Sequence, residues 1–194
     1  MKRIFIGLIV SVIYLTTLQS CSKEEDSYFD LTEEAKELIL YDAGDTFELK
    51  NIETNEIITL TVNWSKFDYS KDGGTPGSIY SGLSGDNYYE RGEYSFSDQT
   101  DCYNGTVAVE ARGNGNFEFS IFTGDCFGEY LTTFEFNSLG FDYGGETASI
   151  NINGTEYSAT YVLNSQNNTI FYTKENGIIQ IFDEVDESAK FTIE

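Results

Sequence analysis

Hydrophobic and polar residues alternate with a period of two along most of the chain after Tyr41. Such alternation is typical of strands that bury one face and leave the other in water. The segments that keep this pattern between turn-forming residues predict strands at residues 45–51, 56–69, 88–97, 105–112, 116–123, 130–137, 146–152, 155–163, 169–174, 178–183 and 190–193. The pattern therefore predicts an all-β fold.

Short connections join these strands, and no long helical pattern interrupts them. Sequential strands joined in this way predict an antiparallel up-and-down meander, which we expect to close into a β-barrel. A two-sheet β-sandwich is the alternative, because alternation does not encode closure. Residues 31–194 have the length of one domain, so we expect a single β domain there.

One short helix is predicted before the first of these strands, over residues 31–40. Thr32 can cap its N-terminus, and the acidic Glu33 and Glu34 suit the positive end of the helix dipole. Its apolar residues fall on one stripe: Leu31, Ala35, Leu38 and Ile39. A single amphipathic helix beside many strands is expected to cover the sheet as a plug or lid.

Two Asn-Gly dipeptides predict tight turns in the C-terminal part, because this dipeptide favours type I′ hairpins. They lie at residues 153–154 and 176–177, with a four-residue loop at residues 165–168 between them. Centring the turns there predicts these cross-strand pairs: Ile150 with Tyr157, Ala148 with Ala159, Leu163 with Ile170, Tyr161 with Tyr172, and Tyr172 with Ile181. One apolar face would then run through four consecutive strands.

The first residues have the pattern of an export signal. Met1-Lys2-Arg3 is positively charged, and residues 4–18 are mostly apolar over the length of a signal core. Leu18-Gln19-Ser20-Cys21 follows and resembles the lipobox of bacterial lipoproteins. The resemblance implies that residues 1–20 are a signal peptide and that Cys21 carries the lipid that anchors the chain to the membrane.

An acidic cluster, Ser22-Lys23-Glu24-Glu25-Asp26, comes directly after this cysteine. It resembles the surface-export signal of Bacteroidetes lipoproteins, which implies an outer-membrane lipoprotein of the cell envelope that is exposed at the cell surface. Residues 21–30 would then form a lipidated cysteine and an acidic tether. The stretches at residues 41–61 and 171–182 also resemble those of small flavobacterial lipoproteins of unknown function, a resemblance that carries no activity.

The two remaining cysteines flank a predicted hairpin with its turn at residues 112–116. Of three plausible registers, only the one centred on Asn114 sets apolar residues opposite one another: Val107 with Ile121, Val109 with Phe119, and Ala111 with Phe117. The same register sets Cys102 opposite Cys126, and Glu110 opposite Glu118. The cell envelope permits oxidation and Cys21 is expected to carry a lipid, so we predict a Cys102–Cys126 disulfide at the rim of the sheet.

The charge and the missing histidine narrow the function classes. The net charge is −22 and falls to −24 if Lys2 and Arg3 leave with the signal, which opposes binding to nucleic acid or to anionic lipid. The chain has no His, so Ser-His-Asp and Cys-His enzymes are excluded. A hydrolase that uses a pair of carboxylates is not excluded.

Two further side-chain groups are candidates for ligand chemistry. Acidic residues near the predicted disulfide and around a Tyr-Gly-Gly sequence suggest a weak possibility of calcium, without the spacing of a known calcium loop: Asp98, Asp101, Asp125, Glu129, Asp142 and Glu146. Aromatic residues could line a cavity or a sugar-stacking surface, but a sheet core explains them better: Tyr88, Tyr89, Tyr94, Phe96, Phe134, Phe136, Phe141 and Tyr143. The alternation does not assign Trp64 to either side of the sheet.

These features favour a non-catalytic binding module on the outer membrane, for a glycan or a small hydrophobic ligand. The alternative is a structural or immunity-type lipoprotein that acts through protein contacts. A carboxylate-pair glycosidase ranks third, since it needs two acids roughly 5–9.5 Å apart in a cleft. We expect no catalytic residues, no resident cofactor or metal, and no nucleic-acid partner.

Overall fold

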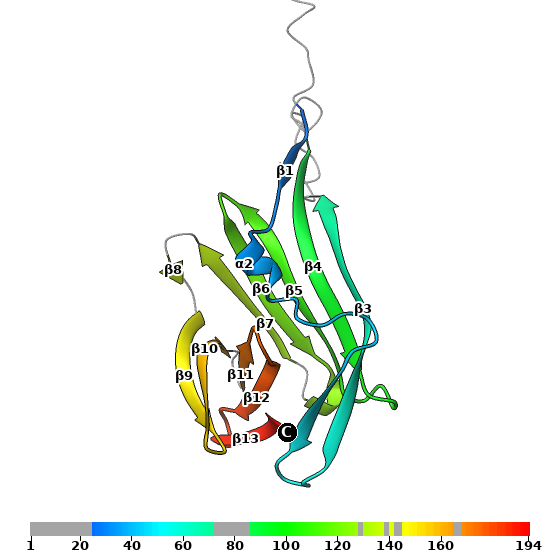
Figure 1. Ribbon diagram of the computed structural model, residues 1–194, viewed down its shortest axis with the longest axis vertical. Helices are drawn as coiled ribbons and strands as arrows, with labels where there is room; N and C mark the ends of the chain where they lie inside the picture. The colour runs from blue at the N-terminus through cyan, green and yellow to red at the C-terminus, as the bar shows by residue number, and fades with distance from the viewer. Residues whose placement is uncertain (1–24, 72–85, 128–129, 138–139, 142–144, 165–167) are drawn as a thin grey trace, which may run out of the picture. The chain divides into compact units, whose positions relative to one another are not determined.

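The computed structural model describes residues 25–71, 86–127, 130–137, 140–141, 145–164 and 168–194 (Figure 1). Strands dominate this part of the chain. The elements are β1 (Ser27–Phe29), α2 (Glu33–Lys36), β2 (Thr46–Asn51), β3 (Ile57–Lys71), β4 (Asn87–Ser97), β5 (Asn104–Gly113), β6 (Asn116–Thr123), the 3-10 helix η1 (Asp125–Phe127), β7 (Tyr130–Asn137), β8 (Gly140–Phe141), β9 (Gly145–Ile152), β10 (Thr155–Asn164), β11 (Asn168–Thr173), β12 (Gly177–Asp183) and β13 (Ser188–Ile193).

The strands form one sheet with the order β8-β7-β6-β5-β4-β3-β2-β13-β12-β11-β10-β9, and β1 pairs with β4 outside this path. Neighbours in the sheet are also neighbours in the sequence, with the exception of β2 and β13. These two strands pair over three residues: Phe191 with Asn51, Thr192 with Lys50, and Ile193 with Leu49. The predicted all-β antiparallel meander is therefore confirmed.

The sheet is open rather than a closed barrel. Strands β8 and β9 lie at its two ends, and no ladder joins them within the described residues. Closure requires matched strand tilt and stagger around the whole ring, which alternation along single strands does not determine. The strands also belong to one continuous sheet, so the alternative of two separate sheets is not observed.

The cysteine-flanked hairpin has the predicted register. Val107 pairs with Ile121 and Val109 with Phe119, and all four side chains are buried. The C-terminal hairpins agree in part: the pairs Ile150–Tyr157, Leu163–Ile170 and Tyr161–Tyr172 are confirmed.

Two predicted C-terminal pairs are wrong, because bulges shift the ladders. Ala148 pairs with Thr160 instead of Ala159, whose positive φ of 51° marks the irregularity. Tyr172 pairs with Ile178 instead of Ile181, because the turn ends at Gly177 with φ at 72° and a second shift follows. Turn chemistry predicts where a hairpin reverses, but not an extra residue inside its ladder.

The two halves of the sheet share one core. Phe119 of β6 lies edge-on to Tyr172 of β11 and Tyr161 of β10, with ring centroids 5.1 and 6.1 Å apart. Phe119 and Tyr172 are fully buried, as is Tyr94 of β4. Because strands far apart in the sheet order meet through these rings, the sheet curls around its apolar face.

The helix is shorter than predicted and occupies the predicted place. It spans Glu33–Lys36, and the Thr32 hydroxyl accepts a hydrogen bond from Ala35 N, as expected of the cap. Ala35 and Leu38 are fully buried against the sheet. The carboxylate of Glu90 on β4 accepts from Leu31 N at 2.9 Å and pairs with Lys36 at 3.1 Å, so this segment is fixed to the inner face.

A small second unit groups the described residues before Phe29 with those at the ends of β3 and β4. In it Ser27 N donates to Asp86 O, and the rings of Tyr28 and Tyr88 stack with centroids 4.9 Å apart. Residues 27–29, which we expected within the tether, are thus a strand. No helix in the described ranges is long and apolar enough to cross a membrane.

Candidate functional site

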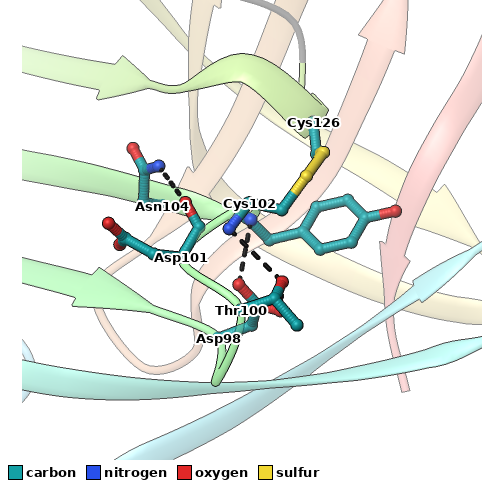
Figure 2. The surroundings of a disulfide bond; sticks show 7 residues. Asp98, Thr100, Asp101, Cys102, Asn104 and Cys126 are labelled. Carbon is teal, nitrogen blue, oxygen red and sulfur yellow. Dashed lines mark hydrogen bonds between the residues drawn. A yellow bond between two sulfur atoms is a disulfide. The ribbon is translucent and has the colours of Figure 1, made fainter.

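The predicted disulfide is present, whereas the predicted lipidation residue Cys21 lies outside the described residues. Cys102 and Cys126 are bonded with their Cα atoms 5.4 Å apart, within the usual range (Figure 2). Regular pairing of β5 with β6 stops at Gly105, and Cys126 lies in η1. The bond therefore holds the β4–β5 loop to the turn after β6, at the rim of the sheet as expected.

Asp98 organises the loop next to the disulfide (Figure 2). Its carboxylate accepts from Tyr103 N at 3.0 Å and from the Thr100 hydroxyl at 2.5 Å. Desolvation opposes its charge, but the hydrogen bonds from Thr100 and from the backbone N–H groups of Tyr103 and Cys102 outweigh it and lower the pKa of this carboxyl. Both carboxylate oxygens of Asp98 therefore accept hydrogen bonds from within this loop.

The described residues hold no cluster of metal ligands that would support the calcium hypothesis. Asn104 donates to the backbone carbonyl of Asp101 and closes the same loop. No group of three or more potential metal ligands occurs in the part of the chain that the structure describes. The remaining candidates, the side chains of Asp125, Glu129, Asp142 and Glu146, lie outside that part.

The predicted aromatic candidates that the structure describes lie in the core or in the small unit. Tyr94 and Phe96 are fully buried, and Tyr89 packs against the core. Burial raises the pKa of the Tyr94 hydroxyl well above its usual value, in keeping with a neutral core residue. Tyr88 belongs to the small unit, and the side chains of Phe134, Phe136, Phe141 and Tyr143 lie outside the described residues. The core interpretation therefore holds for those placed in the main unit.

Trp64 points to the outer face because the alternation of β3 shifts. Before the shift, Ile58, Leu60 and Val62 are buried. After it, Lys66 pairs with Glu93 at 3.1 Å on the outer face of β4, and an added Cβ on Gly92 would meet the Phe67 ring on the inner face. The phase therefore changes between Val62 and Lys66, which leaves Trp64 outside and 39% exposed.

A row of small hydroxyl residues crosses the outer face between two exposed aromatic rings. Ser95 of β4 pairs with Thr106 of β5, which pairs with Phe122 of β6. Trp64 lies at the β3 end of this row, since Asn63 donates to Ser97 and Lys66 pairs with Glu93 on either side of Ser95. Phe122 at the other end is 43% exposed. We call Trp64, Ser95, Thr106 and Phe122 the outer-face row.

Paired charges border the outer-face row on one side. Arg91 of β4 pairs with Glu110 of β5 at 3.2 Å, and Arg112 bonds both Glu110 and Glu118 of β6. The predicted opposition of Glu110 and Glu118 is confirmed, and Arg112 compensates it. Three cations and three carboxylates gather here, counting Lys66 and Glu93. The charges of these six side chains cancel, in a chain whose net charge is −22.

The outer-face row was missed by sequence reasoning, although one signal for it existed. The predicted hairpin register already placed Phe122 on the solvated side, out of phase with Ile121. A large aromatic residue on the wet face of a strand is a candidate for a binding surface when other exposed apolar residues share that face. Trp64 had no such signal, because the alternation changes phase near it in β3 and so does not assign its side chain to either face of the sheet.

Comparison of the chain with protein-family models, with curated proteins and with solved structures finds no match.

Proposed function

We propose that this chain is a surface-exposed, lipid-anchored outer-membrane protein whose β domain binds a neutral glycan without catalysis. The observation that carries the proposal is the outer-face row, in which Trp64 and Phe122 are exposed on either side of the hydroxyl side chains of Ser95 and Thr106. Aromatic rings stack on the apolar faces of sugars, and hydroxyl and charged side chains bond their hydroxyl groups.

The dimensions and charge of this face suit a short neutral oligosaccharide. Trp64 and Phe122 are three strands apart, or roughly 14 Å at the usual strand spacing, which is longer than one sugar ring. Lys66 lies over the Trp64 ring at 5.2 Å, which orients the indole and places a donor beside it. The charges within the neighbouring ion pairs cancel, so these pairs do not favour an ionic sugar.

The same charges argue against the glycosidase hypothesis at this face. The carboxylates of Glu93, Glu110 and Glu118 each hold an Arg or Lys. A glycosidase needs one free carboxylate and one protonated acid. We therefore place a binding function here.

Replacing Trp64 by alanine is expected to weaken glycan binding by about tenfold, which corresponds to about 1.4 kcal/mol, because the stacking surface is lost. Phe122→Ala is expected to act in the same direction. Glycan-array screening of the full-length protein identifies the ligand, and titration calorimetry gives the dissociation constants.

Val185→Ala is the matched control, because Val185 is an apolar residue exposed elsewhere, in the turn between β12 and β13. It should bind like the wild type. Binding restricted to anionic glycans, or equal weakening by all three substitutions, would contradict the proposal.

Cys21→Ser is expected to abolish fatty-acid labelling and to move the protein from the membrane fraction to the soluble fraction. The thioether-linked lipid is the proposed anchor, and each buried methylene contributes about 0.8 kcal/mol. Metabolic labelling with an alkyne-tagged fatty acid measures this. Ser22→Ala should stay labelled and membrane-bound, and a Cys21→Ser protein that still sediments with membranes would refute this anchor.

Protein contact through the same face is the second candidate function. Trp64 and Phe122 share the outer face with Arg91 and Arg112, and aromatic and Arg side chains are enriched in protein interfaces. Cross-linking on intact cells distinguishes the two. A protein adduct that Trp64→Ala removes, without any glycan on the array, would favour this candidate.

A further inference from the structure

A pocket of about 360 Å³ is lined by residues of β2, of the start of β12 and of the end of β13. Its volume lies within the range of small-molecule sites. The lining residues are Thr46, Phe47, Glu48, Asn176, Ile178, Ile193 and Glu194. None of them belongs to the outer-face row, so this is a second and separate site.

The pocket lies where the ladders on both sides of β13 stop. The last ladder pair of β13 with β2 is Ile193 with Leu49, whereas β2 continues to Thr46. On the other side, β12 begins at Gly177, beyond its ladder with β13. The first residues of β2 and of β12 therefore lie beyond the ladders with β13, beside the pocket.

The pocket lining combines exposed polar side chains with more buried apolar ones. Thr46, Glu48 and Glu194 are exposed, whereas Phe47 and Ile193 are half-buried and Ile178 is buried. Phe47 stacks on Tyr41, with ring centroids 5.0 Å apart, so the inner wall continues into the aromatic core. A bound molecule would have its apolar part against Phe47 and Ile178, and its polar part between the two glutamates.

The pocket mouth is negatively charged, and no Lys or Arg is among the residues that line the pocket. Thr59 donates to Oε1 of Glu48 at 3.1 Å, which orients that carboxylate, and within the described residues its Oε2 has no hydrogen bond. Glu194 adds a second carboxylate at the same mouth. An anionic ligand would be repelled here, whereas an ammonium group would gain charge-assisted hydrogen bonds.

We propose that this pocket binds an organic amine with an apolar body, in which the ammonium group contacts Glu48 and Glu194 and the body packs against Phe47, Ile178 and Ile193. The net charge of −22 raises the local concentration of cations around the chain and so supports capture. The proposal does not depend on glycan binding at the outer-face row.

The test is an NMR titration of the full chain with 2-phenylethylamine, which combines one ammonium group with one ring. Two probes separate the contributions: 2-phenylethanol lacks the charge, and ethylamine lacks the ring. We expect saturable binding of 2-phenylethylamine, and at least about tenfold weaker binding of each partial probe.

Glu48→Gln is expected to weaken binding of 2-phenylethylamine by about tenfold, because one charge-assisted contact is lost. Glu56→Gln removes the same charge from the β2–β3 turn outside the pocket and should change binding by less than about twofold. Ile193→Trp fills the interior and should abolish binding. Thermal melts of all three variants verify that they are folded.

Three results would overturn the proposal. They are the absence of saturable binding by the wild type, equal affinity for the amine and the alcohol, and equal weakening by Glu48→Gln and Glu56→Gln. The last would show attraction by overall charge rather than by this pocket.

Discussion

Phe119→Ala is expected to lower the free energy of unfolding by about 3–5 kcal/mol, among the largest losses available to a single core substitution. Phe119 is fully buried, and its ring contacts Tyr161 and Tyr172 from the opposite half of the sheet. Its removal therefore leaves a cavity where the two halves meet. Equilibrium unfolding in urea, followed by tyrosine fluorescence, gives the free energy.

Phe122→Ala is the matched control, because Phe122 lies three residues further on the same strand with 43% of its surface exposed. It should cost less than about 1 kcal/mol. Equal losses for the two variants would mean that the sheet does not curl over Phe119.

Loss of the Cys102–Cys126 disulfide is expected to lower stability by about 3 kcal/mol, because the bond closes a chain segment with a sequence separation of 24. For a chain of this size the loss corresponds to a fall in Tm of about 6–12 °C. Scanning calorimetry of the Cys102→Ser/Cys126→Ser double variant measures it.

Reducing agent provides the internal control for this prediction. It should lower the Tm of the wild type to that of the double variant and leave the double variant unchanged. A wild-type Tm that does not respond to complete reduction, verified by thiol titration, would contradict the predicted stabilisation.

Most of the fold was predictable, because strand alternation and turn chemistry are local properties. Strands β6 and β7 have the predicted ends, and the other predicted strands differ from the observed ones by a few residues. The register of the β5–β6 hairpin followed from one requirement, that Val107, Val109 and Ala111 face apolar partners. That register also predicted the disulfide.

The parts that sequence could not predict depend on single extra residues and on distant partners. A bulge near Ala159 and the phase change before Lys66 move side chains to the other face without any periodic signal. The helix was predicted too long, because only its first turn continues beyond the Thr32 cap. The pocket at the end of β13 depends on pairing between opposite ends of the meander, which no local pattern encodes.

The candidate sites differ in how far they could be foreseen. Phe122 was readable as an exposed aromatic residue once the hairpin register was known. The pocket was not, because Phe47 and Ile178 look like ordinary core positions in the sequence. The pairing of β2 with β13 that brings them to one pocket joins distant parts of the chain.

The pairing of β2 with β13 also bears on the order in which the chain can fold. The contacts that join the two halves span most of the sequence: Tyr172 donates to Leu38 O across 134 residues, and Tyr41 donates to Asn176 O across 135. Such contacts cannot form before the C-terminal strands have been synthesised. Until then the apolar faces of β4, β5 and β6 lack half of their cover, so assembly is expected to be slow and to depend on protection from aggregation.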